Sequence, residues 1–286
     1  MKTLIVCDSG LGGLDIAASF FRKNEPAEWD LIYFNAFPDA KIGYNDLADD
    51  RMKEDVFQNV LESMERYSPA MCLIACNTLS IIWGQLSRRW RPSFPVKGIV
   101  EAAVELMTGA ARREPASHLL ILGTKTTVES QVYPRALTEN GIAPERIHSL
   151  SCHGLARRIE QDPASAEAAS QIADSARQAA AMFQSLPEKL YLCFCCTHYG
   201  YAENCWLQEF GRRFPAVGIL NPNRALSLPG GAAGFRYCSR MEMTDIQRKS
   251  MSEWFAASAP KVAEALRNAK TDLDLFALPE NLRLKE

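Results

Sequence analysis

Short apolar runs recur along the chain, each bounded by small or turn residues and separated by longer stretches with helical periodicity. This alternation predicts parallel strands joined by crossover helices, an α/β fold, and runs this apolar are typical of strands buried on both faces. The expected strands span 4–7, 31–34, 71–76, 96–100, 119–122, 147–150, 190–196 and 216–220. The expected helices span 14–22, 46–67, 101–113, 128–140, 164–186, 245–258 and 261–267.

A weak internal duplication is visible in this pattern. One unit starts with the strand at 4–7 and ends at Cys76, and a second starts at 119–122 and ends at Cys196. Each places a cysteine and a hydroxyl residue just after a buried strand, at the end where ligands bind parallel sheets. Length favours two lobes as well, because 286 residues exceed one typical domain. We expect two similar lobes.

Composition narrows the class of protein. The chain is 47% apolar and 23% charged, with 32 basic and 34 acidic residues and a net charge of −2. This balance argues against nucleic acid or an anionic membrane as the main partner. The first apolar run ends at Asp8, too early for a signal peptide, and no apolar run approaches the ~18 residues of a membrane span.

The nine cysteines are unusual for such a chain. An odd number scattered over a long sequence does not fit a secreted disulfide framework, so we expect reduced thiols and a cytoplasmic protein. His118 and His148 flank strands, and we expect them to be structural, without partner residues nearby.

The segment from Asp8 to Gly13 reads DSGLGG and joins a strand to a helix. Such a glycine turn can bind a phosphate or carboxylate. A dinucleotide site is disfavoured, because Asp15 replaces the third glycine and Asn35 the acidic residue that should end the next strand. From the glycines alone, a tight turn with Asp8 or Ser9 capping the helix is the simpler interpretation.

Two cysteine motifs follow apolar strands. Cys76 stands at the polar edge of its strand and is followed by an amide and a hydroxyl, which favours a partly exposed thiol beside a small polar ligand, whereas Cys72 fits the core. Residues 193–198 read CFCCTH. Zinc would need a second ligand cluster, and the only close pair, at 152–153, has no zinc-knuckle spacing, so we expect no metal. The better interpretation is that Cys196 is a reactive thiol assisted by the imidazole of His198, two positions later in the sequence.

A further strand end, GTKTTVES at 123–130, carries repeated hydroxyls. They suit a carboxylate or an amino-acid backbone, while ordinary capping by Thr126 or Thr127 is the alternative.

Taken together, these motifs resemble the aspartate/glutamate racemase superfamily, and within it the glutamate racemases. The resemblance implies two similar α/β lobes, 1–97 plus 205–286 and 98–204, with the active site in the cleft between them. It implies a cofactor-independent isomerase that converts L- to D-glutamate for cell-wall peptidoglycan, using two opposed thiols as acid and base. A thiol pKa of about 8.5 can be tuned towards 7 by a nearby dipole or cation.

The resemblance also assigns residue roles. It implies Cys76 and Cys196 as the acid/base pair, Asp8 and His198 as their assistants, and Glu160 as a group that orients His198. The residues that would hold the amino-acid substrate are Ser9, Tyr44, Asn77, Thr78, Thr124 and Thr197. Family members often dimerise, so a homodimer is expected.

The sequence departs from the family pattern in the substrate loop at 38–45, where Gly43 replaces the usual proline and Asn45 the usual glycine. The proline that normally follows the histidine motif is Gly200, and a late aspartate is Asn221. Three hypotheses follow: a glutamate racemase; a relative acting on aspartate, a hydantoin or another dicarboxylate; and a homologue that binds ligand without turnover.

Overall fold

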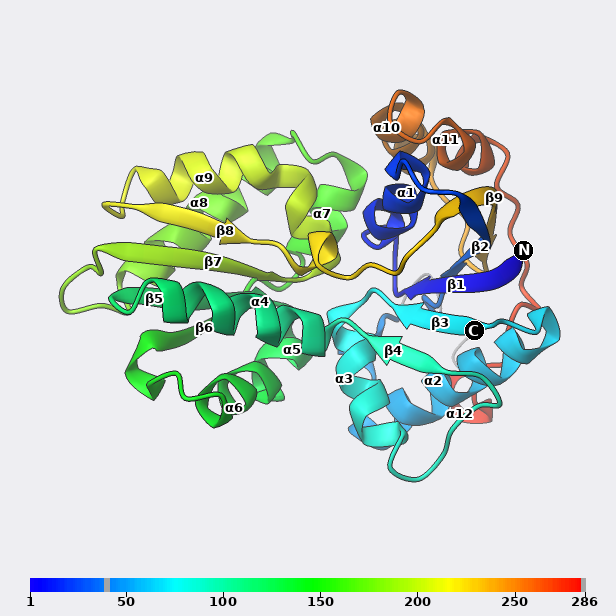
Figure 1. The fold of residues 1–286 in the computed structure, drawn as a ribbon, viewed down its shortest axis with the longest axis horizontal. Coiled ribbons are helices and arrows are strands. Elements are labelled where there is room, and N and C mark those ends of the chain that lie inside the picture. The colour runs from blue at the N-terminus through cyan, green and yellow to red at the C-terminus, as the bar shows by residue number, and fades with distance from the viewer. Residues whose placement is uncertain (39–41, 284–286) are drawn as a thin grey trace. The chain divides into compact units, whose positions relative to one another are not determined.

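The computed structural model describes residues 1–38 and 42–283, which form two compact units (Figure 1). The first unit contains Met1–Gly98 and Ser227–Glu286, and the second contains Ile99–Leu226. The substrate-loop positions Asp39, Ala40 and Lys41 lie outside the described residues. No helix in the described parts of the chain combines the length and apolar character needed to cross a bilayer.

The first unit is built on a five-stranded parallel sheet in the order β4-β3-β1-β2-β9. Its strands are β1 (Lys2–Asp8), β2 (Ala27–Asn35), β3 (Met71–Ile74), β4 (Val96–Gly98) and β9 (Gly231–Ser239). Its helices are α1 (Leu14–Arg22), α2 (Asp50–Met64), α3 (Asn77–Leu86), α10 (Asp245–Ala256), α11 (Pro260–Arg267) and α12 (Glu280–Arg283). Helices α2 and α3 cover one face over a large apolar core, and α1, α10 and α11 cover the other (Figure 1).

The second unit has a four-stranded parallel sheet in the order β6-β5-β7-β8. Its strands are β5 (Ser117–Gly123), β6 (Ile147–Ser151), β7 (Lys189–Cys195) and β8 (Val217–Leu220). Its helices are α4 (Val100–Arg113), α5 (Lys125–Glu129), α6 (Val132–Glu139), α7 (Leu155–Gln161), α8 (Ala166–Ala180) and α9 (Glu203–Gly211). Helices α4, α5 and α6 lie on one side of the sheet and α8 and α9 on the other (Figure 1).

The strand orders confirm the duplication that the sequence suggested. The order β4-β3-β1-β2 in the first unit corresponds to β8-β7-β5-β6 in the second, with β9 as an addition to the first. Cys76 follows β3 and Cys196 follows β7, so the two cysteines occupy equivalent places in the two sheets. All eight expected strands are present, and the α/β prediction is confirmed.

The second unit extends to Leu226, past the limit of 204 that the family resemblance implied. The reason is that β8 pairs with β7 and α9 packs on β8, which keeps residues 203–220 with the second sheet. The first boundary, at Gly98, lies one residue beyond the expected one.

Several elements differ from the sequence prediction. The helix expected over 128–140 is two helices, because Gln131 adopts a left-handed backbone with φ of 55° between them. Strand β9 and helices α3, α7, α9 and α12 were not predicted. Strand β9 reads GAAGFRYCS and is mostly half-buried, so it lacks the apolar run that marks the other strands.

The prediction that His118 and His148 have no partners nearby is wrong. They lie on neighbouring strands, with His118 Nδ1 2.9 Å from His148 Nε2 and the rings stacked 5.2 Å apart. Phe183 packs against both rings. Burial lowers the pKa of each imidazole, which keeps the pair neutral at pH 7.

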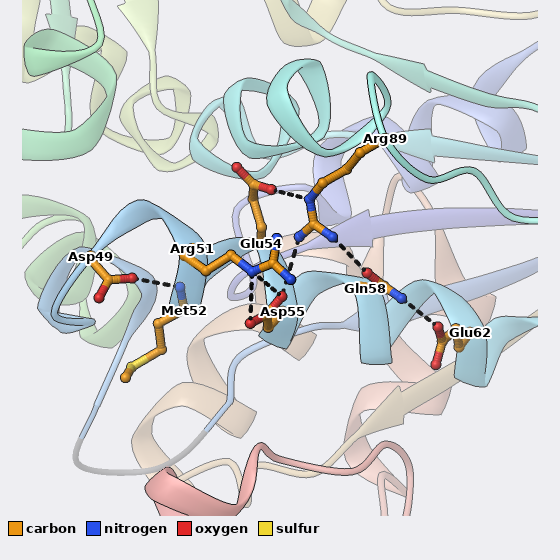
Figure 2. A network of polar contacts seen from close by, with 8 residues as sticks. All are labelled: Asp49, Arg51, Met52, Glu54, Asp55, Gln58, Glu62 and Arg89. Atoms are coloured by element: carbon orange, nitrogen blue, oxygen red, sulfur yellow. Dashed lines mark hydrogen bonds and ion pairs between the residues drawn. The ribbon is translucent and has the colours of Figure 1, made fainter.

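A polar network fixes the end of α3 against α2 (Figure 2). The Arg89 guanidinium donates to Glu54 at 2.7 Å, Asp55 at 3.2 Å and Gln58 at 3.4 Å. Gln58 in turn donates to Glu62 at 2.8 Å. Since α3 starts next to Cys76, this network helps to hold the helix that carries that thiol.

We expect Arg89→Met to lower the free energy of unfolding by about 0.5–1 kcal/mol, the range for a partly exposed ion-pair network. Urea unfolding monitored by circular dichroism measures the change. The control is Arg88→Met, because Arg88 is exposed beside it. Molar NaCl should erase most of the difference through screening; a loss of stability unaffected by salt, or equal in both variants, contradicts the ion-pair explanation.

Candidate active site

The candidate residues of the first unit surround Cys76. This residue is the N-cap of α3, and its sulfur accepts a hydrogen bond from the Leu79 amide at 3.5 Å. Ser9 Oγ lies 3.1 Å from Cys76 Sγ, although 67 positions separate the two residues. The structure therefore brings together two of the sequence-predicted residues through the ends of β1 and β3.

The Cys76 thiol is buried, with 7% of the residue exposed, so the prediction of a partly exposed thiol is wrong. Burial and the neighbouring Asp8 charge raise the pKa of Cys76 to about 12, against smaller opposing effects of Ser9 and Leu79. The expected lowering towards 7 by a helix dipole does not occur at this thiol, because desolvation and a like charge outweigh the hydrogen bonds. Cys76 is thus a protonated thiol at neutral pH.

The glycine turn packs against Asp8. The N-cap of α1 is Gly13, so the interpretation that Asp8 or Ser9 is the N-cap residue is wrong. A Cβ at Gly13 would lie 2.8 Å from Ala75 Cβ and 2.9 Å from Asp8 Oδ2. Only glycine allows this approach. The turn therefore places α1 directly against the Asp8 carboxylate and the strand end that leads to Cys76.

The remaining predicted residues of the first unit differ in position. Asn77 and Thr78 are buried in the first turn of α3, next to Cys76. Tyr44 is 2% exposed and packs edge-on against Phe57, with its ring centroid 6.4 Å away. Burial, and then the charges of Cys7 and Cys76, raise the pKa of the Tyr44 phenol well above its ordinary value. The Tyr44 ring therefore belongs to the core of this unit.

Sequence reasoning missed a pair of polar residues at the ends of β2 and β9. Asn35 Nδ2 donates to the Tyr237 hydroxyl at 3.2 Å, and Tyr237 stacks on Tyr33 at 5.8 Å. Tyr33 in turn donates to the Gly10 carbonyl at 2.8 Å. The one sequence signal for this pair is that Asn35, a polar residue, ends an apolar strand. Tyr237 gave no signal, because it lies on the strand that was not predicted.

The candidate residues of the second unit include a chain of three side chains. His198 Nδ1 lies 3.7 Å from Cys196 Sγ, and His198 Nε2 lies 2.7 Å from Glu160 Oε2. Cys196 follows β7, His198 stands in the 3₁₀ turn Thr197–Ala202, and Glu160 belongs to α7. Cys196 is 7% exposed. The predicted orientation of His198 by Glu160 is present as a hydrogen bond.

The His198 imidazole is held in its charged form. Burial alone would lower its pKa, but hydrogen bonds to Cys196 and Glu160, together with their charges, raise the pKa well above its ordinary value. A protonated imidazole directs an N–H at each of its two neighbours, the Cys196 sulfur and the Glu160 carboxylate. The two thiols therefore have opposite surroundings: a carboxylate near Cys76 and an imidazolium near Cys196.

Replacing Glu160 by glutamine should lower the His198 pKa, because the opposite charge that favours imidazolium is removed. Titration of the His198 ring by ¹⁵N NMR measures the change. Since the pKa of His198 is raised in the folded state, the stability it contributes is present below about pH 6.5 and is lost as pH rises through the folded value. Glu188→Gln is the control, and an unchanged His198 titration in Glu160→Gln contradicts the assignment.

Two other predicted residues of the second unit, Thr197 and Thr124, make local hydrogen bonds. Thr197 is buried, and its carbonyl accepts from Asn223 Nδ2 at 3.0 Å. Thr124 is the N-cap of α5, with its hydroxyl 3.4 Å from the Thr127 amide and 3.1 Å from the Thr127 hydroxyl. Capping thus exists here, but by Thr124 and not by the two threonines that the sequence suggested.

Two of the departures from the family pattern lie together. A Cβ on Gly200 would lie 2.6 Å from Asn221 Nδ2, so the Asn221 amide fills the space that a side chain at 200 would need. Asn221 Oδ1 accepts from the Asn223 amide at 3.1 Å. The two replacements form one local arrangement beside the Thr197–Ala202 turn.

Comparison with known proteins places this geometry in a family. The model of the Asp/Glu/Hydantoin racemase family matches residues 25–185, more than half of the chain. The chain belongs to the Asp/Glu/Hydantoin racemase family. The matched range includes Cys76 and Thr124, while Asp8 and Cys196 lie outside it.

Individual members of this family resemble the chain more locally. It is 30% identical to the glutamate racemase of Campylobacter jejuni over 139 residues, 48% of this chain and 52% of that protein. The chain thus matches about half the length of such relatives. The crystal structure of glutamate racemase from Campylobacter jejuni has the same fold, with a TM-score of 0.71 at 20% identity over 89% of this chain and 98% of that one. The Francisella tularensis glutamate racemase, solved with D-glutamate, has a TM-score of 0.66 at 18% identity over 95% of both chains.

Proposed function

We propose that this chain is a cofactor-independent amino-acid racemase, with glutamate as the first substrate to test and L- to D-glutamate conversion for peptidoglycan as its role. The observation that carries the proposal is the duplicated thiol. Cys76 and Cys196 follow equivalent strands in two sheets of the same order, and each has its own polar partners. The family match and the D-glutamate bound by the Francisella tularensis relative support the substrate class.

Racemisation needs one group to remove the α-proton and a second, on the other face of the carbon, to return one. The surroundings of the two thiols suit these different tasks. Cys76, with its raised pKa, holds a proton that it can donate. The Cys196 sulfur, facing the His198 imidazolium, is suited to accept one. After one turnover the proton positions are exchanged, and the enzyme is ready for the opposite enantiomer.

The α-proton beside a carboxylate is weakly acidic, so the site must stabilise the negative charge that develops when it leaves. We propose that hydroxyl and amide groups at the strand ends do so by binding the substrate carboxylate and amine. The proposed groups are Ser9, Asn77, Thr78, Thr124 and Thr197. Asp8 and His198 are proposed to assist Cys76 and Cys196 in proton transfer.

A second candidate function is racemisation of a different acidic substrate, such as aspartate, a hydantoin or another dicarboxylate. The observation that favours it is the altered substrate loop, in which Gly43 and Asn45 replace the proline and glycine usual in glutamate racemases. The replaced pair at Gly200 and Asn221 is a further difference.

Proton exchange with D₂O tests reaction and substrate together. The purified chain, without added cofactor, should incorporate deuterium at the α-carbon of both enantiomers of its substrate and interconvert them, as followed by ¹H NMR and circular dichroism. Glutamate, aspartate and hydantoins form the panel. Exchange with aspartate or a hydantoin but not glutamate supports the second candidate, and saturable binding without exchange for the whole panel rejects the racemase proposal.

A further inference from the structure

A polar groove lies in the second unit, next to Cys152 and along helix α8. It encloses about 410 Å³ between the end of β6, helix α7 and helix α8. The residues from α8 recur at helical spacing and occupy one face of that helix. The lining residues are Ser151, Cys152, His153, Arg158, Glu167, Ser170, Gln171, Asp174, Ser175 and Gln178.

Gln171, one of the lining residues of the groove, has a side-chain oxygen that lacks a donor. Gln171 Nε2 donates to the His153 carbonyl at 2.6 Å, which fixes the amide so that Oε1 is the free end. This oxygen is buried and receives no hydrogen bond from any described residue. A buried acceptor without a donor costs about 1–3 kcal/mol, so a bound group that donates here would be stabilised.

The walls of the groove carry opposite charges. Arg158 from α7 and Glu167 from α8 form no ion pair with a described residue, whereas Asp174 is paired with Arg177. A guanidinium matches a carboxylate, and a carboxylate beside an unsatisfied amide oxygen matches an ammonium group. The groove therefore offers both charges that a zwitterion requires, within the volume of a small-molecule site.

The groove is connected to the candidate active site through α7 and Cys152. Arg158 lies two positions before Glu160, the residue that hydrogen-bonds His198. The Cys152 sulfur lies 3.5 Å from Ser175 Oγ. The backbone carbonyl of Cys152 accepts a hydrogen bond at 3.5 Å from the hydroxyl of Tyr199, which belongs to the same turn as His198. A ligand in the groove would contact the same helix that orients the imidazole.

We propose that this groove is a second ligand site, for a small zwitterion of the amino-acid class, and that its occupancy alters the Glu160–His198 hydrogen bond. Arg158 binds the carboxylate, and Glu167 with Gln171 Oε1 binds the ammonium group. Binding does not depend on the proposed function, but an effect on catalysis rests on it.

Binding is tested on the full chain by isothermal titration and ligand-detected NMR with glycine, L-glutamate and L-lysine. N-acetylglycine and glycinamide, which each lack one charge, are the ligand controls. We expect a binding event for at least one amino acid that is weakened at least tenfold by Arg158→Met and by Glu167→Gln. Arg157→Met on α7 and Glu101→Gln in the first turn of α4 should leave it unchanged, since both residues are exposed and lie outside the groove.

Three results overturn the site: the absence of any event sensitive to the groove variants, equal weakening by the control variants, or equal binding of the singly charged probes. The ¹⁵N resonances of His198 test the coupling without requiring turnover. They should shift on binding in the wild type and not in Arg158→Met. Binding with an unchanged His198 spectrum rejects the coupling, and binding with a shifted spectrum but no α-proton exchange rejects the racemase function alone.

Discussion

Serine in place of either Cys76 or Cys196 abolishes interconversion of the substrate enantiomers, with an expected loss of about 10²–10⁴-fold for each replacement. A hydroxyl keeps the polarity of the thiol but is a far weaker acid, so it cannot exchange a proton at the α-carbon at a useful rate. The measurement is the initial rate of optical rotation change, with Cys205→Ser as a control at a partly exposed cysteine outside both strand ends.

The two single variants should also differ in a diagnostic way. Each variant retains one thiol. That thiol can still remove the α-proton from the enantiomer whose α-proton faces it, and it can return a deuteron to the same face of the carbon. Deuterium exchange without inversion is therefore expected for one enantiomer in Cys76→Ser and for the opposite one in Cys196→Ser. Exchange of the same enantiomer in both variants, or full inversion in either, contradicts a mechanism with two opposed thiols.

Alkaline pH should destabilise the protein steeply, because several buried thiols stay protonated in the folded state. Burial is the largest cause at each of them, raising the pKa of Cys152 to about 11 and of Cys76 to about 12, and raising those of Cys7, Cys193 and Cys195 well above the ordinary value of a thiol. In the unfolded chain these thiols ionise near pH 9. Above that pH the folded state binds more protons than the unfolded state, so the free energy of unfolding falls as pH rises.

Where a thiol is protonated in the folded state and ionised in the unfolded state, the free energy of unfolding falls by about 1.4 kcal/mol per pH unit. Five such thiols together give a fall of about 7 kcal/mol per pH unit. Against a typical stability of about 5–15 kcal/mol, this predicts unfolding within about two units above pH 9. Urea titrations at pH 7, 8, 8.5 and 9 measure the onset of the fall, because tyrosine, with a pKa of about 10, ionises mainly above this range. Cys193→Ala should be less stable at pH 7 yet show a shallower fall; an unchanged slope in that variant contradicts the thiol explanation.

The sequence predicts those parts of the fold that depend on local burial. Strands such as 4–7 and 190–196 are buried on both faces, so their apolar runs identify them, and the cysteines at their ends are placed correctly for the same reason. Strand β9 escapes prediction because it is an edge strand whose pairing with β2, about 200 positions earlier, is set by tertiary contacts. Helix α3 is apolar on most sides and shows no clear periodicity.

The candidate site divides in the same way. The Cys196–His198 pair is local in sequence and could be predicted, whereas the contact between Ser9 and Cys76 depends on the adjacency of β1 and β3. The raised pKa of Cys76 could not be predicted, since it follows from burial and the position of Asp8 rather than from residue type. Tyr44 matches the family motif by position, but its burial against Phe57 is visible only in three dimensions.

The contact between Gly200 and Asn221 changes how divergence from the glutamate racemases should be counted. A Cβ at position 200 would lie 2.6 Å from the Asn221 amide nitrogen, so the two positions share one space in the fold. A larger residue at 200 requires the Asn221 side chain to turn away. The tolerance of position 200 therefore depends on the side chain at 221, and a difference at one position should be weighed together with the other.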